Sequence, residues 1–230
     1  MSRGVRFVSE DGAEGRPVEV IGRSELTLRA LDQSSYPVLT NYPVIDIQIP
    51  KVLQEARSAL PALSPSDFDD FTRALIYLSR YAGMVQQSGV FKGKKVHEVK
   101  DFQNDLLRQL RMTELGSEVR EGERLAGGNL DLHYRNIVIE LKVEDSVPDR
   151  ATLRAKYIEQ PVQYTTSSIP LSITCILDMA EKERPPANVA NNITLETPPL
   201  HGFAQTAAEY PSKVAVLIID GNIKSPSDYS

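Results

Sequence analysis

Asp131, Glu140 and Lys142 are residue types that could perform chemistry together, and they lie in one stretch of alternating apolar and polar residues. Such alternation predicts two short strands joined at Arg135-Asn136. In a hairpin that is symmetric about this turn, Asp131 faces Glu140, and Lys142 shares the face of Glu140. Carboxylates about 5 Å apart repel by about 3 kcal/mol at an effective dielectric of about 20. A fold keeps such a pair when a cation lies between the carboxylates or when one of them is protonated, and with Lys142 on the same face the three residues predict a divalent-metal site with a cationic helper.

Two alternatives for the same residues stay open. Arg-Asn is not a preferred pair for a two-residue hairpin, and a three-residue loop would change the register and separate Asp131 from Glu140. An aspartate and a Glu-x-Lys on neighbouring strands also suit an ordinary solvated face, since exposed strand faces carry charged residues.

The surroundings of these residues resemble a known nuclease family. Asp131 is followed by Glu140-Leu141-Lys142 after the apolar Ile137-Val138-Ile139, and Gly127-Gly128 precedes the first strand. This pattern resembles the PD-(D/E)XK, or restriction-endonuclease-like, nuclease superfamily. Gln160-Pro161-Val162-Gln163-Tyr164 is similar to the Gln-x-x-x-Tyr motif of the branch typified by bacterial recombination exonucleases. The resemblance covers about residues 96 to 180.

The resemblance implies a catalytic role for five residues. Asp131 and Glu140 would hold Mg²⁺, with Mn²⁺ as the expected substitute, and Lys142 would assist attack by water on a phosphodiester. Gln160 would contact a metal ligand or a metal-bound water, and Tyr164 would position a phosphate or brace its helix. Taken alone, Tyr164 also suits a core aromatic residue with a hydrated hydroxyl.

Two further metal ligands are implied by the resemblance. One is the backbone carbonyl of Leu141, and the other is an acidic residue on the preceding helix. Glu98 lies four residues before Phe102 and so shares the buried-facing side of that helix. Glu121 or Glu123 on the next strand is the alternative ligand, and Glu98 also suits an exposed carboxylate at a helix start.

The order of the expected elements indicates the fold class. Together with the resemblance, it predicts an α/β protein with a restriction-endonuclease-like core, in which helices flank a mixed central sheet in αβββαβ order. The expected elements are a helix at 97–112, strands at 118–125, 128–134 and 137–144, a helix at 146–164 and strands at 170–177 and 214–219.

The remaining segments suggest how the chain is divided. Residues 1–90 are expected to form a mainly helical accessory region, with strands at 18–21 and 44–49 and a helix at 64–84. Residues 91–224 would form the nuclease-like domain, in which the Pro-rich segment 181–211 could be a flap over the site. Residues 225–230 would be a flexible tail.

Charge bears on the type of partner. The net charge of −5 argues against a protein that coats nucleic acid by bulk attraction, but a local basic surface can still contact it. Residues 91–112 carry six basic against three acidic side chains, and Lys92, Lys94 and Lys95 are the candidate nucleic-acid contacts. The alternative is that these charges form a solvated helix face.

The sequence therefore predicts a Mg²⁺-dependent nuclease that acts on DNA, in defence against foreign DNA such as a virus, or in repair. The alternative is a non-catalytic module of the nuclease fold that binds nucleic acid or scaffolds a partner protein. A second copy of the chain or a partner protein is a further expected contact. A cytoplasmic location without a membrane partner is expected, because there is one cysteine and no apolar run long enough for a membrane span or a signal peptide.

Overall fold

The chain divides into two compact units, Met1–Ser35 and Tyr36–Ser230. In the first unit, β1 (Arg3–Val5) pairs antiparallel with β2 (Val18–Val20), and β2 confirms the strand predicted there. The computed structural model describes residues 3–5, 18–20, 39–96, 99–122, 124–125, 128–129, 131–146, 149–158, 169–182, 189–198, 212–224 and 227.

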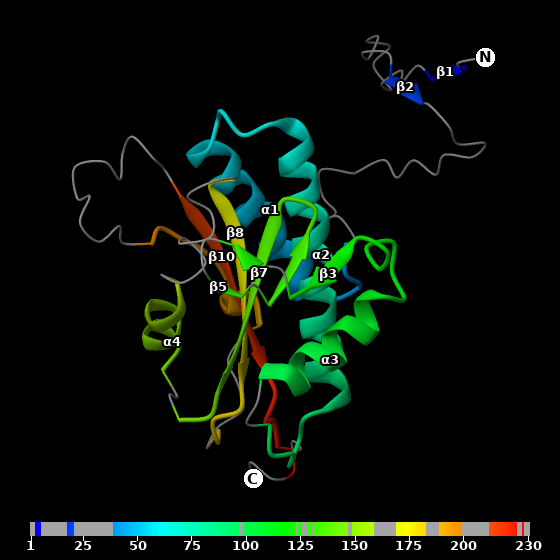
Figure 1. Ribbon diagram of the computed structural model, residues 1–230. Helices are drawn as coiled ribbons and strands as arrows, with labels where there is room; N and C mark the ends of the chain where they lie inside the picture. The colour runs from blue at the N-terminus through cyan, green and yellow to red at the C-terminus, as the bar shows by residue number, and fades with distance from the viewer. Residues whose placement is uncertain are drawn as a thin grey trace. The chain divides into compact units, whose positions relative to one another are not determined.

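The second unit is built on a mixed sheet of six strands, in the order β3-β6-β7-β8-β10-β9, with four α-helices among the described residues (Figure 1). The α/β class is therefore confirmed. The strands are β3 (Val119–Glu121), β6 (Leu132–Tyr134), β7 (Ile137–Glu144), β8 (Leu171–Asp178), β9 (Ile193–Glu196) and β10 (Lys213–Asp220). The helices are α1 (Pro43–Ala59), α2 (Pro65–Ser88), α3 (Val99–Leu110) and α4 (Arg150–Tyr157), and a short 3-10 helix, η1, spans Val189–Asn192. A separate antiparallel pair joins β4 (Arg124–Leu125) to β5 (Gly128–Asn129).

Strand direction changes across the sheet. β3, β6 and β7 are antiparallel neighbours, whereas β7, β8 and β10 run parallel to one another. α4 lies in the chain between β7 and β8, because parallel neighbours need a crossover connection. β9 closes one edge, antiparallel to β10. Within this sheet, the order from α3 to β8 is therefore a helix, three antiparallel strands, a helix and a parallel strand, and the β4-β5 pair is inserted between β3 and β6.

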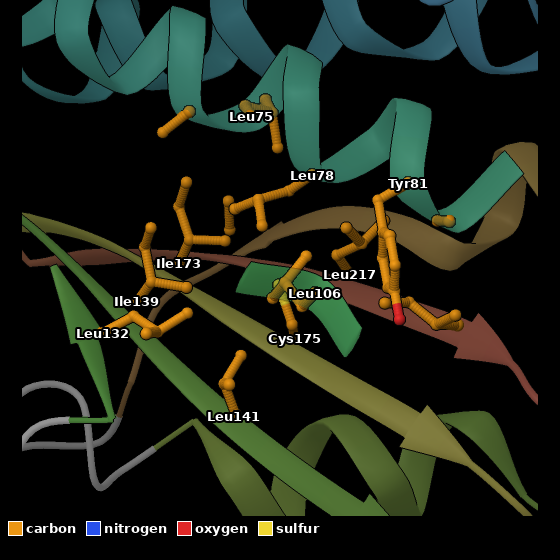
Figure 2. Close-up of a cluster of buried hydrophobic side chains, with 14 of the residues drawn as sticks. Leu75, Leu78, Tyr81, Leu106, Leu132, Ile139, Leu141, Ile173, Cys175 and Leu217 are labelled. Carbon is orange, nitrogen blue, oxygen red and sulfur yellow. The ribbon is translucent and has the colours of Figure 1, made fainter. Parts of the chain in front are cut away.

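The two faces of the sheet carry different side chains. On one face, Ile139, Ile173 and Leu217 from neighbouring strands belong to the main core, into which α2 and α3 bury leucines such as Leu75 and Leu106 (Figure 2). Burial of each such side chain contributes about 1.5–3 kcal/mol. The alternate residues of the same strands point to the opposite face.

That opposite face is apolar in one part and polar in another. Leu153 of α4 packs there against a smaller cluster that includes Ile176 and Val216. Over β7 and the first half of β8, the same face carries polar residues, among them Glu140 and Thr174. The candidate site lies in this polar part.

Several predictions about the elements were wrong. The strands expected at 118–125 and 128–134 are each interrupted, at Gly122, whose φ is 76°, and at Asp131, and the pieces β4 and β5 pair with each other outside the main sheet. The segment 44–49 was expected to be a strand, because apolar and polar residues alternate at its end, but it belongs to α1. Ile45, Ile49, Val52 and Ala56 are all buried, and their helical spacing determines the structure. In the Pro-rich segment 181–211, for which no helix or strand was expected, the structure contains η1 and β9.

Helices α1 and α2 share the main core with the sheet, although both belong to the predicted accessory region. α2 starts at the predicted place, with the hydroxyl of Ser64 accepting the Asp67 N–H, and it ends at Gly89, whose φ is 59°. The accessory role of residues 1–90 and the boundary near residue 90 stay predictions. In the described part of the chain, every helix is too short or too polar to cross a membrane.

Candidate functional site

The hairpin of β6 and β7 has the predicted register. Leu132 pairs with Ile139 and Tyr134 with Ile137, so the chain turns at Arg135 and Asn136. This turn places the residue before β6, Asp131, opposite Glu140. The symmetric hairpin expected from the alternation is therefore confirmed.

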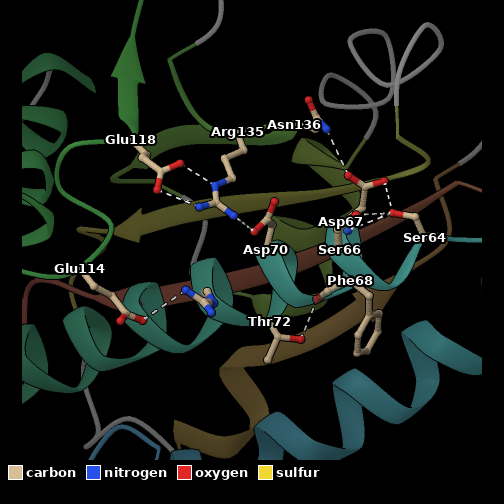
Figure 3. Close-up of polar contacts among 11 residues, drawn as sticks. Ser64, Ser66, Asp67, Phe68, Asp70, Thr72, Glu114, Glu118, Arg135 and Asn136 are labelled. Carbon is tan, nitrogen blue, oxygen red and sulfur yellow. Dashed lines mark hydrogen bonds and ion pairs between the residues drawn. The ribbon is translucent and has the colours of Figure 1, made fainter. Parts of the chain in front are cut away.

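Ion pairs hold the turn in place (Figure 3). Arg135 has a φ of 52°, in the left-handed region that a non-glycine residue enters at a cost of about 1–2 kcal/mol. Its guanidinium donates to Glu118 Oε1 at 2.9 Å and to the buried Asp70 Oδ1 at 2.7 Å. Asn136 Nδ2 donates to Asp67 Oδ1 at 3.1 Å. These contacts fix the turn to α2 and so determine which residues face each other further along the hairpin.

Asp131 lies directly before β6, and its side chain bonds to the backbone of β7 as a neighbouring strand would. Its Oδ2 accepts the backbone N–H of Leu141 at 2.9 Å, and its carbonyl accepts a hydrogen bond of 3.4 Å from Gln103 of α3. Burial raises the pKa of Asp131, against the lowering effects of the Leu141 hydrogen bond and the Lys142 charge. The carboxylate is therefore oriented toward β7 but remains poorly compensated.

Glu140 lies beside it in the same polar part of the sheet and is only 1% exposed. Its Oε1 accepts a hydrogen bond of 2.6 Å from Lys142 Nζ, while its buried Oε2 has no hydrogen-bond partner among the residues that the structure describes. Burial raises the pKa of Glu140, and the charge of Asp131 adds to this effect, whereas Lys142 opposes it. The ammonium of Lys142 is thus shared by two carboxylates, and burial disfavours the ionised form of both.

The backbone of Leu141 adds a third oxygen. In a strand, the N–H and C=O of one residue point to the same edge. Since the Leu141 N–H points to Asp131, its carbonyl faces that edge too. The side chain of Leu141 is buried in the main core on the other side of the strand.

This set of oxygens fits a hard divalent cation. Magnesium is commonly bound by one or two carboxylates and keeps several waters, so Asp131, Glu140 and the Leu141 carbonyl would be sufficient protein ligands. The unpartnered Glu140 Oε2 is the clearest sign of fit, because buried carboxylate oxygens normally have a partner. Among the residues that the structure describes, no group of three or more Asp, Glu, His or Cys side chains is gathered for a metal, so waters would complete the shell.

Other predicted site residues are placed elsewhere or are not described. Glu98, Gln160 and Tyr164 lie outside the described residues, as does Glu123. Glu121 is exposed and engaged by Gln103 and Arg111, with Gln103 Nε2 at 3.0 Å from its Oε2. The candidate nucleic-acid contacts, Lys92, Lys94 and Lys95, are exposed in the connection between α2 and α3.

Three residues near the site were missed by the sequence interpretation. Gln103 reaches both Glu121 and the Asp131 carbonyl from α3, and Ser172 and Thr174 lie on β8 beside Val138 and Glu140. A polar residue on an otherwise apolar strand was the available signal for Ser172 and Thr174. Which residues of β7 lie beside Ser172 and Thr174 could be known only from the parallel pairing of β7 with β8.

A second row of acidic residues marks the carboxyl ends of the parallel strands. Glu144, Asp178 and Asp220 are register neighbours on β7, β8 and β10, and all three are buried. Arg150 donates to Asp220 at 2.6 Å, and Lys182 lies 3.2 Å from Asp178. Burial raises the pKa of Asp178, and Asp220 adds to this effect, while Lys182 opposes it. These ion pairs tie α4 and the segment after β8 to the sheet.

Glu144 gives this row a testable pH dependence. Burial opposes its ionisation, but hydrogen bonds from Lys156, Ser146 and Tyr157 outweigh that effect and lower the pKa to about 2. Because the folded pKa lies below the ordinary 4.5, the contribution to stability is complete above about pH 4.5 and is lost as the pH falls toward 2. We expect Glu144→Gln to reduce the free energy of unfolding at pH 7 by about 1.5–3 kcal/mol.

The measurement is chemical unfolding at a series of pH values from 7 to 2. The difference between Glu144→Gln and wild type should shrink toward zero at the acidic end. Glu181→Gln is the matched control, because that glutamate is exposed. A difference that stays constant with pH would show that the carboxylate charge is not what stabilises this corner.

No protein-family model, no curated protein and no solved structure matches this chain. The fold and the site define an α/β protein with a carboxylate pair and a lysine on one face of a mixed sheet. Its function is therefore inferred from these residues and their geometry.

Proposed function

We propose that this chain is a divalent-metal-dependent nuclease that hydrolyses phosphodiester bonds of DNA. The observation that carries the proposal is the arrangement of Asp131, Glu140 and Lys142 at the end of the β6-β7 hairpin. Asp131 and Glu140 lie opposite each other with raised pKa values, and Lys142 is bound to one oxygen of Glu140 while the other oxygen is buried without a partner. Two carboxylates can hold a metal ion that activates water for phosphodiester hydrolysis, and an ammonium beside them can stabilise the charge that develops on the phosphate.

The order of the elements supports the same proposal. Apart from the short β4-β5 pair between β3 and β6, the elements α3, β3, β6, β7, α4 and β8 run as helix, three antiparallel strands, helix and parallel strand. This is the αβββαβ order expected from the resemblance to PD-(D/E)XK nucleases, so a restriction-endonuclease-like core is part of the proposal. In this proposed core, Asp131 directly before β6 and Glu140-Leu141-Lys142 on β7 would be the motif residues.

Asp131, Glu140 and the Leu141 carbonyl would hold Mg²⁺ or Mn²⁺. When bound, the metal would lower the pKa of a coordinated water and neutralise charge on the phosphate. Lys142 is half-buried, and its ammonium lies 2.6 Å from Glu140 Oε1, so its position is fixed relative to the metal ligands. From there it would orient the attacking water and stabilise the negative charge that develops on the phosphate oxygens. The hydrogen bond from Leu141 N–H would keep Asp131 directed at the metal.

The direct test is an assay of the purified protein on circular and linear DNA, single- and double-stranded, with Mg²⁺, Mn²⁺ or EDTA. We expect cleavage with either metal and none in EDTA, and cutting of closed circles would identify an endonuclease. Asp69→Asn, a change at an exposed aspartate of α2, should cut like wild type. Equal cutting in EDTA would contradict the proposal, as would no cutting together with no Mn²⁺ binding by calorimetry. Binding of DNA without cleavage would favour the non-catalytic module. Roles in defence or repair stay predictions.

A further inference from the structure

On the polar part of the sheet, three neighbouring oxygens have no hydrogen-bond partner in the described part of the chain. They are Glu140 Oε2, Thr174 Oγ1 and Ser172 Oγ. Each belongs to a residue that is at most 1% exposed, so bulk water does not reach it. Buried polar atoms normally have a partner in the protein or in ordered water, and several adjacent exceptions indicate a bound ligand or water that completes them.

The strand register explains why these oxygens are neighbours. β7 and β8 are parallel, with Glu140 beside Thr174 and Val138 beside Ser172. Register partners project from the same face, and adjacent strands lie about 4.8 Å apart. Ser172 and Thr174 are two positions apart on β8, so both hydroxyls share the face of Glu140. Ile173 between them is buried in the main core on the other side.

We propose that Thr174, assisted by Ser172, holds a water of a hydrated divalent cation bound at Asp131 and Glu140. This inference rests on the proposed function. A magnesium ion bound by few protein ligands keeps several waters, and because the oxygen of each water binds the metal, its hydrogens need acceptors nearby. With the cation on Glu140 Oε2, a water bound to that cation would donate to Thr174 Oγ1, so the metal completes the carboxylate and its water completes the hydroxyl. Thr174 is therefore a positioning residue that acts on the metal through water.

Thr174→Val tests this assignment, because valine has nearly the same shape and lacks the hydroxyl. Thr194→Val is the matched control, since Thr194 Oγ1 is also buried without a partner but lies on β9, separated from β8 by β10. We expect Thr174→Val to weaken Mn²⁺ binding by about 10-fold or more in titration calorimetry on the full chain. Thr194→Val should bind Mn²⁺ like wild type. Without metal, both variants should melt at or above the wild-type temperature, because each loses a buried hydroxyl without a partner.

Thr174→Ser provides a rescue that separates the hydroxyl from packing. It keeps the hydroxyl and should bind Mn²⁺ within a fewfold of wild type, even if the smaller side chain lowers the melting temperature. If Thr174→Val binds Mn²⁺ as tightly as wild type, or if Thr174→Ser binds as weakly as Thr174→Val, the inference is wrong and the proposed function stands. If the wild-type chain binds no Mn²⁺ at all, the metal site itself is refuted, and the proposed function and this inference fail together.

Discussion

Lys142→Met is expected to slow DNA cleavage by about 10²-fold or more while the protein still binds Mn²⁺. Methionine keeps most of the apolar stem and removes the ammonium that lies 2.6 Å from Glu140 Oε1. Because the metal ligands remain, the variant should still bind Mn²⁺, with the same or a lower affinity. The chemical step should be slowed, because it needs a positioned positive charge. Single-turnover cleavage at saturating metal, together with calorimetry of Mn²⁺ binding, measures the two effects separately.

The control for this change is Lys51→Met, which removes an exposed ammonium from α1. It should cut DNA at the wild-type rate. If Lys142→Met folds, binds Mn²⁺ and cuts as fast as wild type, Lys142 has only a charge-balancing role toward Glu140. If it loses metal binding altogether, the lysine stabilises the site rather than the reaction.

Asp131→Asn is expected to abolish both Mn²⁺ binding and cleavage, and to stabilise the protein in the absence of metal. Burial raises the pKa of both Asp131 and Glu140, so their ionised forms cost stability at neutral pH, and that cost falls as the pH is lowered toward the folded pKa values. Asparagine removes one of the two charges, and its amide oxygen can still accept the Leu141 N–H. The gain is at most about 3 kcal/mol before screening, for carboxylates about 5 Å apart.

Thermal melts in EDTA at pH 7 and pH 5 test this prediction. Asp131→Asn should melt above wild type at pH 7, and the difference should be smaller at pH 5, where the wild-type carboxylates are closer to protonation. In saturating Mn²⁺ the order should reverse, because only the wild type gains the binding free energy. If Asp131→Asn instead destabilises the metal-free protein, Asp131, Glu140 and Lys142 form an ordinary charge cluster without a metal.

The hairpin was the part of the site that could be predicted from sequence. The alternation around Leu132 and Ile139 specifies which face each residue takes, and a one-residue shift would turn every apolar side chain outward. Even so, the ion pairs of Arg135 with Glu118 and Asp70, which hold the unusual turn, depend on contacts between distant segments. The alternation of apolar and polar residues along one segment does not predict contacts of this kind.

The parts that could not be predicted share a physical cause. In α1, the local alternation of Ile45, Ile47 and Ile49 favoured a strand, and packing against the sheet decided for a helix. Thr174 was not considered, because its neighbour Glu140 is brought to it by a crossover through α4. In both cases the deciding interaction joins segments far apart in the chain. The roles of Glu98, Gln160 and Tyr164 stay predictions.

The short length of β6 has a consequence for the edge of the sheet. β7 continues past Ile139 to Glu144, but β6 begins only at Leu132, which pairs with Ile139. Among the described strands, the second half of β7 therefore has a neighbour only in β8. A strand edge with free backbone groups invites pairing with another chain. At this edge, Asp131 Oδ2 accepts the hydrogen bond of the Leu141 N–H, and the charged Lys142 is the next residue along β7. The polar residues that would bind a metal therefore also protect the edge of the sheet, and exchanging them together for apolar residues would expose a template for aggregation.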